Sequence, residues 1–169
     1  MTEQLAQEFA IEWHGDQKRK YTGEPYWHHP RNVAEKVKSV TDDLEVIQAA
    51  WLHDVLEDTP ATVEDIIWIF GPCVTSYVLG VTDQFTSEAY PHLNRATRKR
   101  LEAERYQTHC WQVKTIKLAD MIDNTKSIVE HDPAFAKVYV PEKQLMLRYL
   151  LGGAQELWNE ASAQVGGAL

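Results

Sequence analysis

The sequence has few cysteines and no long apolar run, and these absences exclude several classes of protein. Cys73 and Cys110 are its two cysteines, and they form neither a CxxC motif nor a disulfide framework. The apolar runs are far shorter than the ~18 residues that a membrane span needs. The N-terminus is acidic and amphipathic, unlike a signal peptide. We therefore expect a cytoplasmic protein in a reducing setting, with no membrane partner.

Basic residues are outnumbered, because 17 Lys and Arg face 25 Asp and Glu, for a net charge of −8. This excess disfavours binding to nucleic acid or to an anionic membrane through the overall field of the protein. A small anionic ligand is still compatible with a local basic cluster, and Lys18, Arg19 and Lys20 form one. We therefore expect a small-molecule partner and no nucleic acid. An oligomer is compatible with the sequence but not indicated by it.

Strand-like alternation of useful length is also missing, and the apolar spacing is helical almost throughout. We expect one all-α domain, a helical bundle of seven or eight helices over residues 1–169. Apart from the segment after Thr41–Asp43 discussed next, the expected helices cover residues 2–13, 30–40, 62–70, 72–82, 94–108, 111–131 and 141–164. The expected loops cover residues 14–29, 83–93 and 131–140.

Residues 49–60, AAWLHDVLEDTP, place four polar groups in a segment that otherwise reads as a buried helix. On one helix, His53 and Glu57 lie four residues apart, and Asp54 and Asp58 lie four apart on the adjoining face. Ionised groups taken out of water cost several kcal/mol each unless they are compensated. Either the side of the helix that carries these four groups faces solvent, as an acidic helix end would, or a cation lies against it.

A second acidic stretch is TIKLADMIDNTKSI, residues 115–128. Asp120 lies in an apolar run, and Asn124 follows it by one helical turn. The alternative is the ordinary polar stripe of an amphipathic helix.

A third stretch, HGDQKRKYTGEPYWHHP, covers residues 14–30 and combines histidines with a basic triplet and aromatic rings. Its composition suits an anion pocket, with cations for phosphates and rings to stack on a base. A polar loop with Gly-Glu-Pro turn chemistry is the alternative.

Taken together, these stretches resemble the HD-superfamily metal-dependent phosphohydrolases, specifically the hydrolase domain of RelA/SpoT-type alarmone enzymes and the small alarmone hydrolases. The family carries His-x-x-Gln-x-Arg-Lys, then Gly-Glu-Pro-Tyr-x-x-His-Pro, then Leu-His-Asp-x-x-Glu-Asp-Thr, and then Lys-Leu-Ala-Asp with Asn four residues later. In this sequence the four motifs are His14–Lys20, Gly23–Pro30, Leu52–Thr59 and Lys117–Asn124. The similarity covers about residues 5–130, and four ordered motifs are far more specific than one.

The resemblance implies a metal site made of two imidazoles and two carboxylates: His29, His53, Asp54 and Asp120. The x-x-His-Pro pattern selects His29 over His28. A mixed nitrogen and oxygen site suits a first-row divalent ion. The precedent in the family is Mn²⁺, although the residues alone do not separate it from other such ions.

The resemblance also implies roles for further side chains. Glu57 and Asp58 would act in catalysis by orienting or deprotonating the attacking water. Substrate contacts are expected from four side chains: Arg19, Lys20, Asn124 and His14. For His14 the alternative is that it contacts the residues that bind the ligand, without touching the ligand itself.

The expected activity is Mn²⁺-dependent removal of the 3′-pyrophosphate from ppGpp or pppGpp. Met121 and Asp123 depart from the family pattern, Trp27 stands where an aliphatic residue is common, and the 83–97 loop matches little. These departures leave open another nucleotide, such as NADPH at its 2′-phosphate or a dNTP. A nucleotide-binding protein without turnover is a third hypothesis, which the intact set of metal and catalytic residues disfavours.

Overall fold

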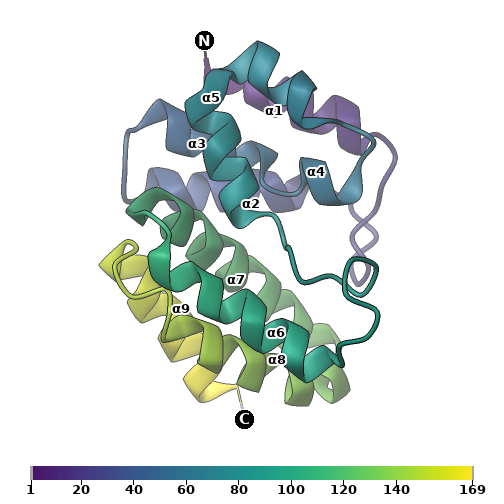
Figure 1. The fold of residues 1–169 in the computed structure, drawn as a ribbon, viewed down its shortest axis with the longest axis vertical. Coiled ribbons are helices and arrows are strands. Elements are labelled where there is room, and N and C mark those ends of the chain that lie inside the picture. Colours follow the sequence, from purple (N-terminus) through teal and green to yellow (C-terminus); the bar gives the residue numbers. More distant parts are fainter. Residues whose placement is uncertain (1, 169) are drawn as a thin grey trace. The chain divides into compact units, whose positions relative to one another are not determined.

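The computed structural model describes residues 2–168, and every regular element within that range is helical (Figure 1). The elements are α1 (Glu3–His14), α2 (His28–Lys38), α3 (Leu44–Leu52), α4 (Val55–Asp58), α5 (Val63–Val81), α6 (Arg95–Arg105), the 3₁₀ turn η1 (Tyr106–Thr108), α7 (Trp111–His131), α8 (Pro133–Leu147) and α9 (Gln155–Gly167). Eight of these helices have nine residues or more, and α4 is a single turn. The predicted all-α fold is confirmed.

The chain divides into two compact units, Met1–Thr82 and Asp83–Leu169. In unit 1, α3 contacts α1, α2 and α5. Every residue of α3 from Val46 to Leu52 is buried, which explains why its sequence is almost entirely apolar. The side chain of Asp43 begins the helix by accepting a hydrogen bond from the amide of Glu45. The single domain over residues 1–169 stays a prediction.

In unit 2, α8 contacts α6, α7 and α9, and α7 also packs against α9. The chain comes close to α7 just before α9 begins. Gly153 leaves so little room that an added Cβ would lie 2.9 Å from Cδ1 of Leu118. The amide of Ala154 donates to Oγ1 of Thr115 at 3.0 Å in the buried interior.

The C-terminal helices differ from the expectation. A loop over 131–140 and one helix over 141–164 were predicted, but α8 already begins at Pro133 and ends at Leu147. The Asp132 side chain accepts from the amide of Phe135 and caps this helix, so Pro133 is the proline in the first turn. Pro141 lies inside α8 instead. The predicted long helix is broken before α9, where Gly152 has a φ of 90°.

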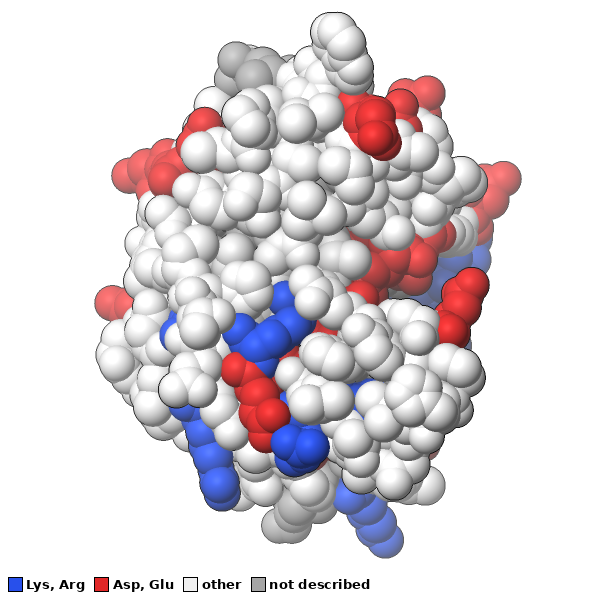
Figure 2. Space-filling view, viewed as in Figure 1, with Lys and Arg blue, Asp and Glu red and all other residues white. Residues whose placement is uncertain are grey.

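Helix α5 has the length and composition of a membrane span, with 19 residues and a mean hydropathy of 1.2. The same test is passed by core helices of soluble proteins, and a third of this window is buried. Gly71, with φ 82° and ψ 175°, breaks it into two helices, as predicted, and each is too short for the ~20 residues of a span. The surface over α5 is largely uncharged (Figure 2), and Trp68 is 87% exposed there.

Candidate metal centre

The His53–Asp54 pair lies in a turn between two helices of unit 1. One continuous helix was expected to carry the motif, but α3 ends at Leu52 and α4 starts at Val55. Asp54 has φ −99° and ψ −5°, so the chain leaves regular helical geometry at this residue. The amides of Glu57 and Asp58 then bond to the carbonyl of Asp54 and start α4. In a regular helix, the side chains of consecutive residues point in directions about 100° apart. The turn allows His53 and Asp54 to point into the same space.

The tautomer of His53 follows from its partner. Its Nδ1 lies 2.8 Å from the carbonyl oxygen of Ala50, which only accepts, so Nδ1 carries the proton. A neutral His53 ring therefore carries its lone pair on Nε2, the state that a metal ligand requires. This Nε2 lies 3.1 Å from Nε2 of His29, in the first turn of α2, and both rings are buried.

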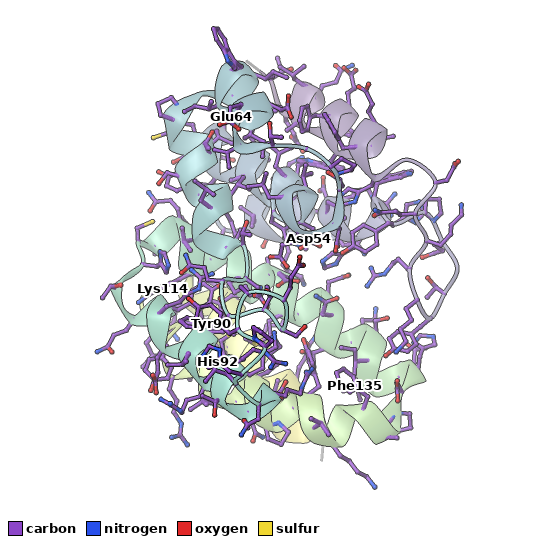
Figure 3. All side chains as sticks on the ribbon, turned by 45° about the vertical axis from the view of Figure 1, so that its right-hand side comes forward. Asp54, Glu64, Tyr90, His92, Lys114 and Phe135 are labelled. Atoms are coloured by element: carbon purple, nitrogen blue, oxygen red, sulfur yellow. The ribbon has the colours of Figure 1, made fainter. Side chains whose placement is uncertain are left out.

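Asp54 completes a three-atom cluster at the turn between α3 and α4, where Figure 3 labels it. Its Oδ2 lies 3.1 Å from Nε2 of His53 and 3.3 Å from Nε2 of His29. Burial alone would raise the pKa of Asp54, but a proton on the facing ring nitrogens of His53 and His29, in the place that a metal ion would take, holds this pKa well below its usual value. Two imidazole nitrogens and an ionised carboxylate oxygen, all within 3.3 Å of one another, are donors of the type that holds a divalent metal ion.

Tyr26 is one of the aromatic residues of the 14–30 stretch, whose rings were expected to stack on a base, and it contacts this cluster through its hydroxyl. Its hydroxyl donates to Oδ2 of Asp54 at 2.7 Å. Burial raises the pKa of Tyr26, and the carboxylates of Asp54 and Asp58 raise it further, so the phenol keeps its proton. The signal for it in the sequence was its place three residues before His29 in the Gly-Glu-Pro-Tyr motif.

His14 lies at the end of α1, behind Tyr26. Its Nδ1 lies 2.9 Å from Oε1 of Gln17, and its ring centroid is 4.7 Å from that of Tyr26. Burial lowers the pKa of His14, so the ring is neutral at physiological pH. Its Nε2 is buried and has no hydrogen-bond partner among the described residues. A buried polar atom without a partner is uncommon in proteins, and this Nε2 has the capacity to accept one hydrogen bond.

The two proposed catalytic carboxylates lie on α4, one turn beyond the His53–Asp54 turn. Both Glu57 and Asp58 are exposed residues. Partial burial of the Asp58 carboxyl raises its pKa, and the charge of Asp54 raises it further. Gln17 donates to the carbonyl oxygen of Asp58 at 2.5 Å, which ties the loop after α1 to α4.

The predicted phosphate-binding cations lie in the loop between α1 and α2. Arg19 is held by a tight turn, in which its amide donates to the carbonyl of Glu24 at 2.8 Å and its own carbonyl accepts from Gly23. Nζ of Lys20 donates to the hydroxyl of Tyr21 at 3.2 Å. His28 lies apart from the cluster, with Nδ1 3.7 Å from the carboxylate of Glu24, so the structure brings His29 and not His28 to His53.

The remaining predicted residues belong to unit 2. Asn124 donates to Oδ1 of Asp120 at 2.5 Å, and Nζ of Lys117 lies 3.1 Å from Oδ2. The expected i, i+4 pair on α7 is therefore formed. Asp83 links Lys117 to Lys99, with an Nζ to Oδ2 distance of 2.8 Å for Lys99.

Lys143 is a further member of this charged region that the sequence did not single out. Burial lowers the pKa of Lys143 to about 8, and the neighbouring cations Lys117 and Lys99 contribute. Its Nζ lies 5.0 Å from the ring centroid of Tyr139. No sequence signal marks Lys143, because a lysine on a helix usually faces solvent.

Comparison with protein families identifies the chain. The model of the HD domain family matches residues 6–145. The chain belongs to the HD domain family. The recognition made from the four motifs is thereby confirmed.

Curated relatives lie within the same group. The chain is 43% identical over 129 residues to the guanosine-3′,5′-bis(diphosphate) 3′-pyrophosphohydrolase of Aquifex aeolicus, covering 74% of this chain and 17% of that protein. It is 40% identical over 124 residues to the Danio rerio protein of the same name, MESH1, covering 71% of this chain and 65% of that protein. The chain thus spans less than two thirds of either relative.

A solved structure has the same fold over nearly the whole chain. It is described as a metazoan ortholog of SpoT that hydrolyses ppGpp, and it superimposes with a TM-score of 0.85 at 30% identity. The match covers 99% of this chain and 96% of that one.

Proposed function

We propose that the protein is a divalent-metal-dependent phosphohydrolase that converts ppGpp to GDP and pyrophosphate, and pppGpp to GTP and pyrophosphate. The observation that carries this proposal is the cluster of His29 Nε2, His53 Nε2 and Asp54 Oδ2. The activities named for the Aquifex aeolicus and Danio rerio relatives support the choice of substrate.

The fourth ligand in this proposal is Asp120 of unit 2, so that residues 1–169 act as one HD-type domain. Support comes from the Lys-Leu-Ala-Asp motif and from the bonds to Asn124 and Lys117, which fix the orientation of the Asp120 carboxylate on α7. The ion itself is proposed to be Mn²⁺. A bound divalent ion would lower the pKa of a water and neutralise phosphoryl oxygens.

The side chains around the cluster have separate tasks in this proposal. Glu57 accepts a proton from the attacking water, and Asp58 orients that water through a hydrogen bond. Arg19 and Lys20 bind phosphate oxygens, which matches their position in a loop held by backbone bonds. Asn124 contacts the sugar or a phosphate, and the unpartnered Nε2 of His14 accepts a hydrogen bond from a substrate hydroxyl or from a water on the phosphate.

The setting proposed for the enzyme is the cytoplasm. Cys73 and Cys110 are both free thiols and both exposed, as a reducing compartment permits.

Product analysis tests the substrate. The full chain, loaded with Mn²⁺, is incubated separately with ppGpp, NADPH and a set of dNTPs, and released phosphate, pyrophosphate and nucleotide are quantified. Pyrophosphate and GDP from ppGpp, at a kcat/KM far above that for the other compounds, is the expected result. Faster turnover of NADPH or a dNTP would overturn the substrate assignment, and no turnover of any compound would overturn the activity.

A further inference from the structure

Tyr26 is fixed more firmly than a loop residue that only lines a pocket. Its amide donates to the carbonyl of Gln17 at 2.9 Å, and its carbonyl accepts from the amide of His29 at 2.8 Å. The isolated bridge between Lys18 and Pro25 closes the loop just before it. The backbone of Tyr26 is therefore tied both to the start of the loop, at Gln17, and to the first turn of α2, at His29.

The ring of Tyr26 is also held on two sides. Its centroid lies 4.7 Å from that of His14 and 5.9 Å from that of His29. These contacts fix the position of the ring, and its hydroxyl donates to Oδ2 of Asp54 at 2.7 Å. The donor comes from a residue 28 positions away in the sequence, so the bond depends on the tertiary fold of unit 1.

The oxygen that accepts this hydrogen bond is also the carboxylate oxygen nearest the two imidazoles. Oδ2 of Asp54 is the same atom that lies 3.1 Å from Nε2 of His53 and 3.3 Å from Nε2 of His29. A carboxylate rotates freely about its side-chain bond unless a hydrogen bond fixes it, and such outer bonds usually orient metal ligands. Removing an outer hydrogen bond typically weakens metal binding by about 10- to 100-fold.

We infer that Tyr26 is a positioning residue, whose hydroxyl holds Oδ2 of Asp54 toward the space shared with His29 and His53 and so sets the affinity for a divalent ion. This inference rests on the proposed function, because it assumes that the three-atom cluster binds metal. It assigns a role to a side chain outside the expected sets of ligands, catalytic carboxylates and substrate contacts.

The test is calorimetric titration of the metal-free full chain with Mn²⁺, comparing the wild type with Tyr26→Phe. Phenylalanine keeps the ring contacts with His14 and His29 and removes only the hydroxyl. We expect the Kd for Mn²⁺ to rise by about 10- to 100-fold. The Mn²⁺ concentration that gives half-maximal turnover should rise by the same factor, while kcat at saturating Mn²⁺ recovers to near the wild-type value. A purely structural role would lower stability without this shift in Kd.

Tyr21→Phe is the matched control, because Tyr21 is in the same loop and its hydroxyl bonds to Lys20 instead. Its Kd for Mn²⁺ should equal that of the wild type. A wild-type chain that binds no Mn²⁺ contradicts the proposed function. A wild-type chain that binds Mn²⁺ with the same Kd as Tyr26→Phe contradicts this inference alone.

A second measurement keeps the native hydroxyl, in case the phenylalanine variant does not fold. 3-Fluorotyrosine is incorporated at position 26 and its fluorine resonance is followed while diamagnetic Zn²⁺ is added. The resonance should move and stop moving at one equivalent, because the acceptor of the hydroxyl becomes a metal ligand. A resonance that does not move, although calorimetry shows that the same chain binds Zn²⁺, would overturn the inference, whereas a chain that binds no Zn²⁺ would contradict the proposed function.

Discussion

The Nε2 atoms of His29 and His53 lie 3.1 Å apart, although 24 residues separate them in the chain. The proton on Nδ1 of His53, bonded to Ala50, leaves the lone pair of Nε2 directed at this contact. Without a metal ion, one of these two nitrogens must carry a proton and donate it to the other. The carboxylate of Asp54 lies beside the pair. A divalent cation satisfies all three groups at once, and the following predictions test that arrangement.

Asp54→Ala should abolish both metal binding and turnover, because it removes the ionised oxygen of the cluster. The wild-type chain should retain Mn²⁺ after dialysis, and the variant should not, as measured by elemental analysis. Excess Mn²⁺ should raise the thermal midpoint of the wild type, since a ligand at 100 times its Kd adds about 2.7 kcal/mol of stability. Asp42→Ala, which removes an exposed carboxylate of the same unit, should behave as the wild type. Retained turnover in a metal-free Asp54→Ala chain would refute the mechanism.

Glu57→Ala should separate catalysis from metal binding. Glu57 is exposed on α4 and lies outside the three-atom cluster, so the variant should bind Mn²⁺ with unchanged affinity. Loss of the group that accepts the proton of the water should lower kcat by about 10²- to 10⁴-fold. Calorimetry and pyrophosphate release on the same preparation measure both quantities. An unchanged kcat would show that Glu57 has another role.

The sequence predicted some elements closely and misplaced others for identifiable reasons. The helix expected over 111–131 is α7 (Trp111–His131), because its apolar periodicity is long and uninterrupted. The start of α8 was misplaced because both Pro133 and Pro141 suit a first helical turn. The side chain of Asp132, a good capping residue directly before Pro133, was the signal that distinguished them.

In the candidate site, the sequence predicted which residues gather but not the bonds between residues far apart in the chain. Motif order brought His29, His53 and Asp54 into one hypothesis, and these residues do lie together in unit 1. The hydroxyl of Tyr26 was missed because the motif places Tyr26 three residues before His29 but does not identify its partner, Asp54, which is 28 residues away. The break between α3 and α4 was also missed, since His53 and Asp54 both fit a helical repeat.

Lys143→Met should stabilise the protein at pH 7 and lose this advantage in base. The folded-state pKa of about 8 lies below the usual lysine pKa of 10.5, so the unfolded chain binds more protons between these pH values. The penalty for holding the charged lysine is therefore complete below pH 8 and fades as the pH rises toward 10.5. We expect a gain of about 1 to 3 kcal/mol at pH 7, measured by urea unfolding. Lys137→Met, an exposed lysine on the same helix, should change little at either pH. Equal stabilisation by Lys143→Met at pH 7 and pH 10.5 would contradict the electrostatic explanation.

Gly153→Ala should destabilise unit 2 through a steric clash. The added Cβ would lie 2.9 Å from Cδ1 of Leu118 and 3.1 Å from Cβ of Lys114, both on α7. Overpacking of this kind typically costs about 1 to 3 kcal/mol. Gly166→Ala is the matched control on the neighbouring helix α9, since its Cβ meets nothing within 4 Å. Alanine favours a helix over glycine by up to about 1 kcal/mol, so the control should be neutral or stabilising. Urea midpoints that fall for Gly153→Ala and do not fall for Gly166→Ala would show that this approach to α7 is tightly packed, whereas equal midpoints would show that the segment before α9 yields easily.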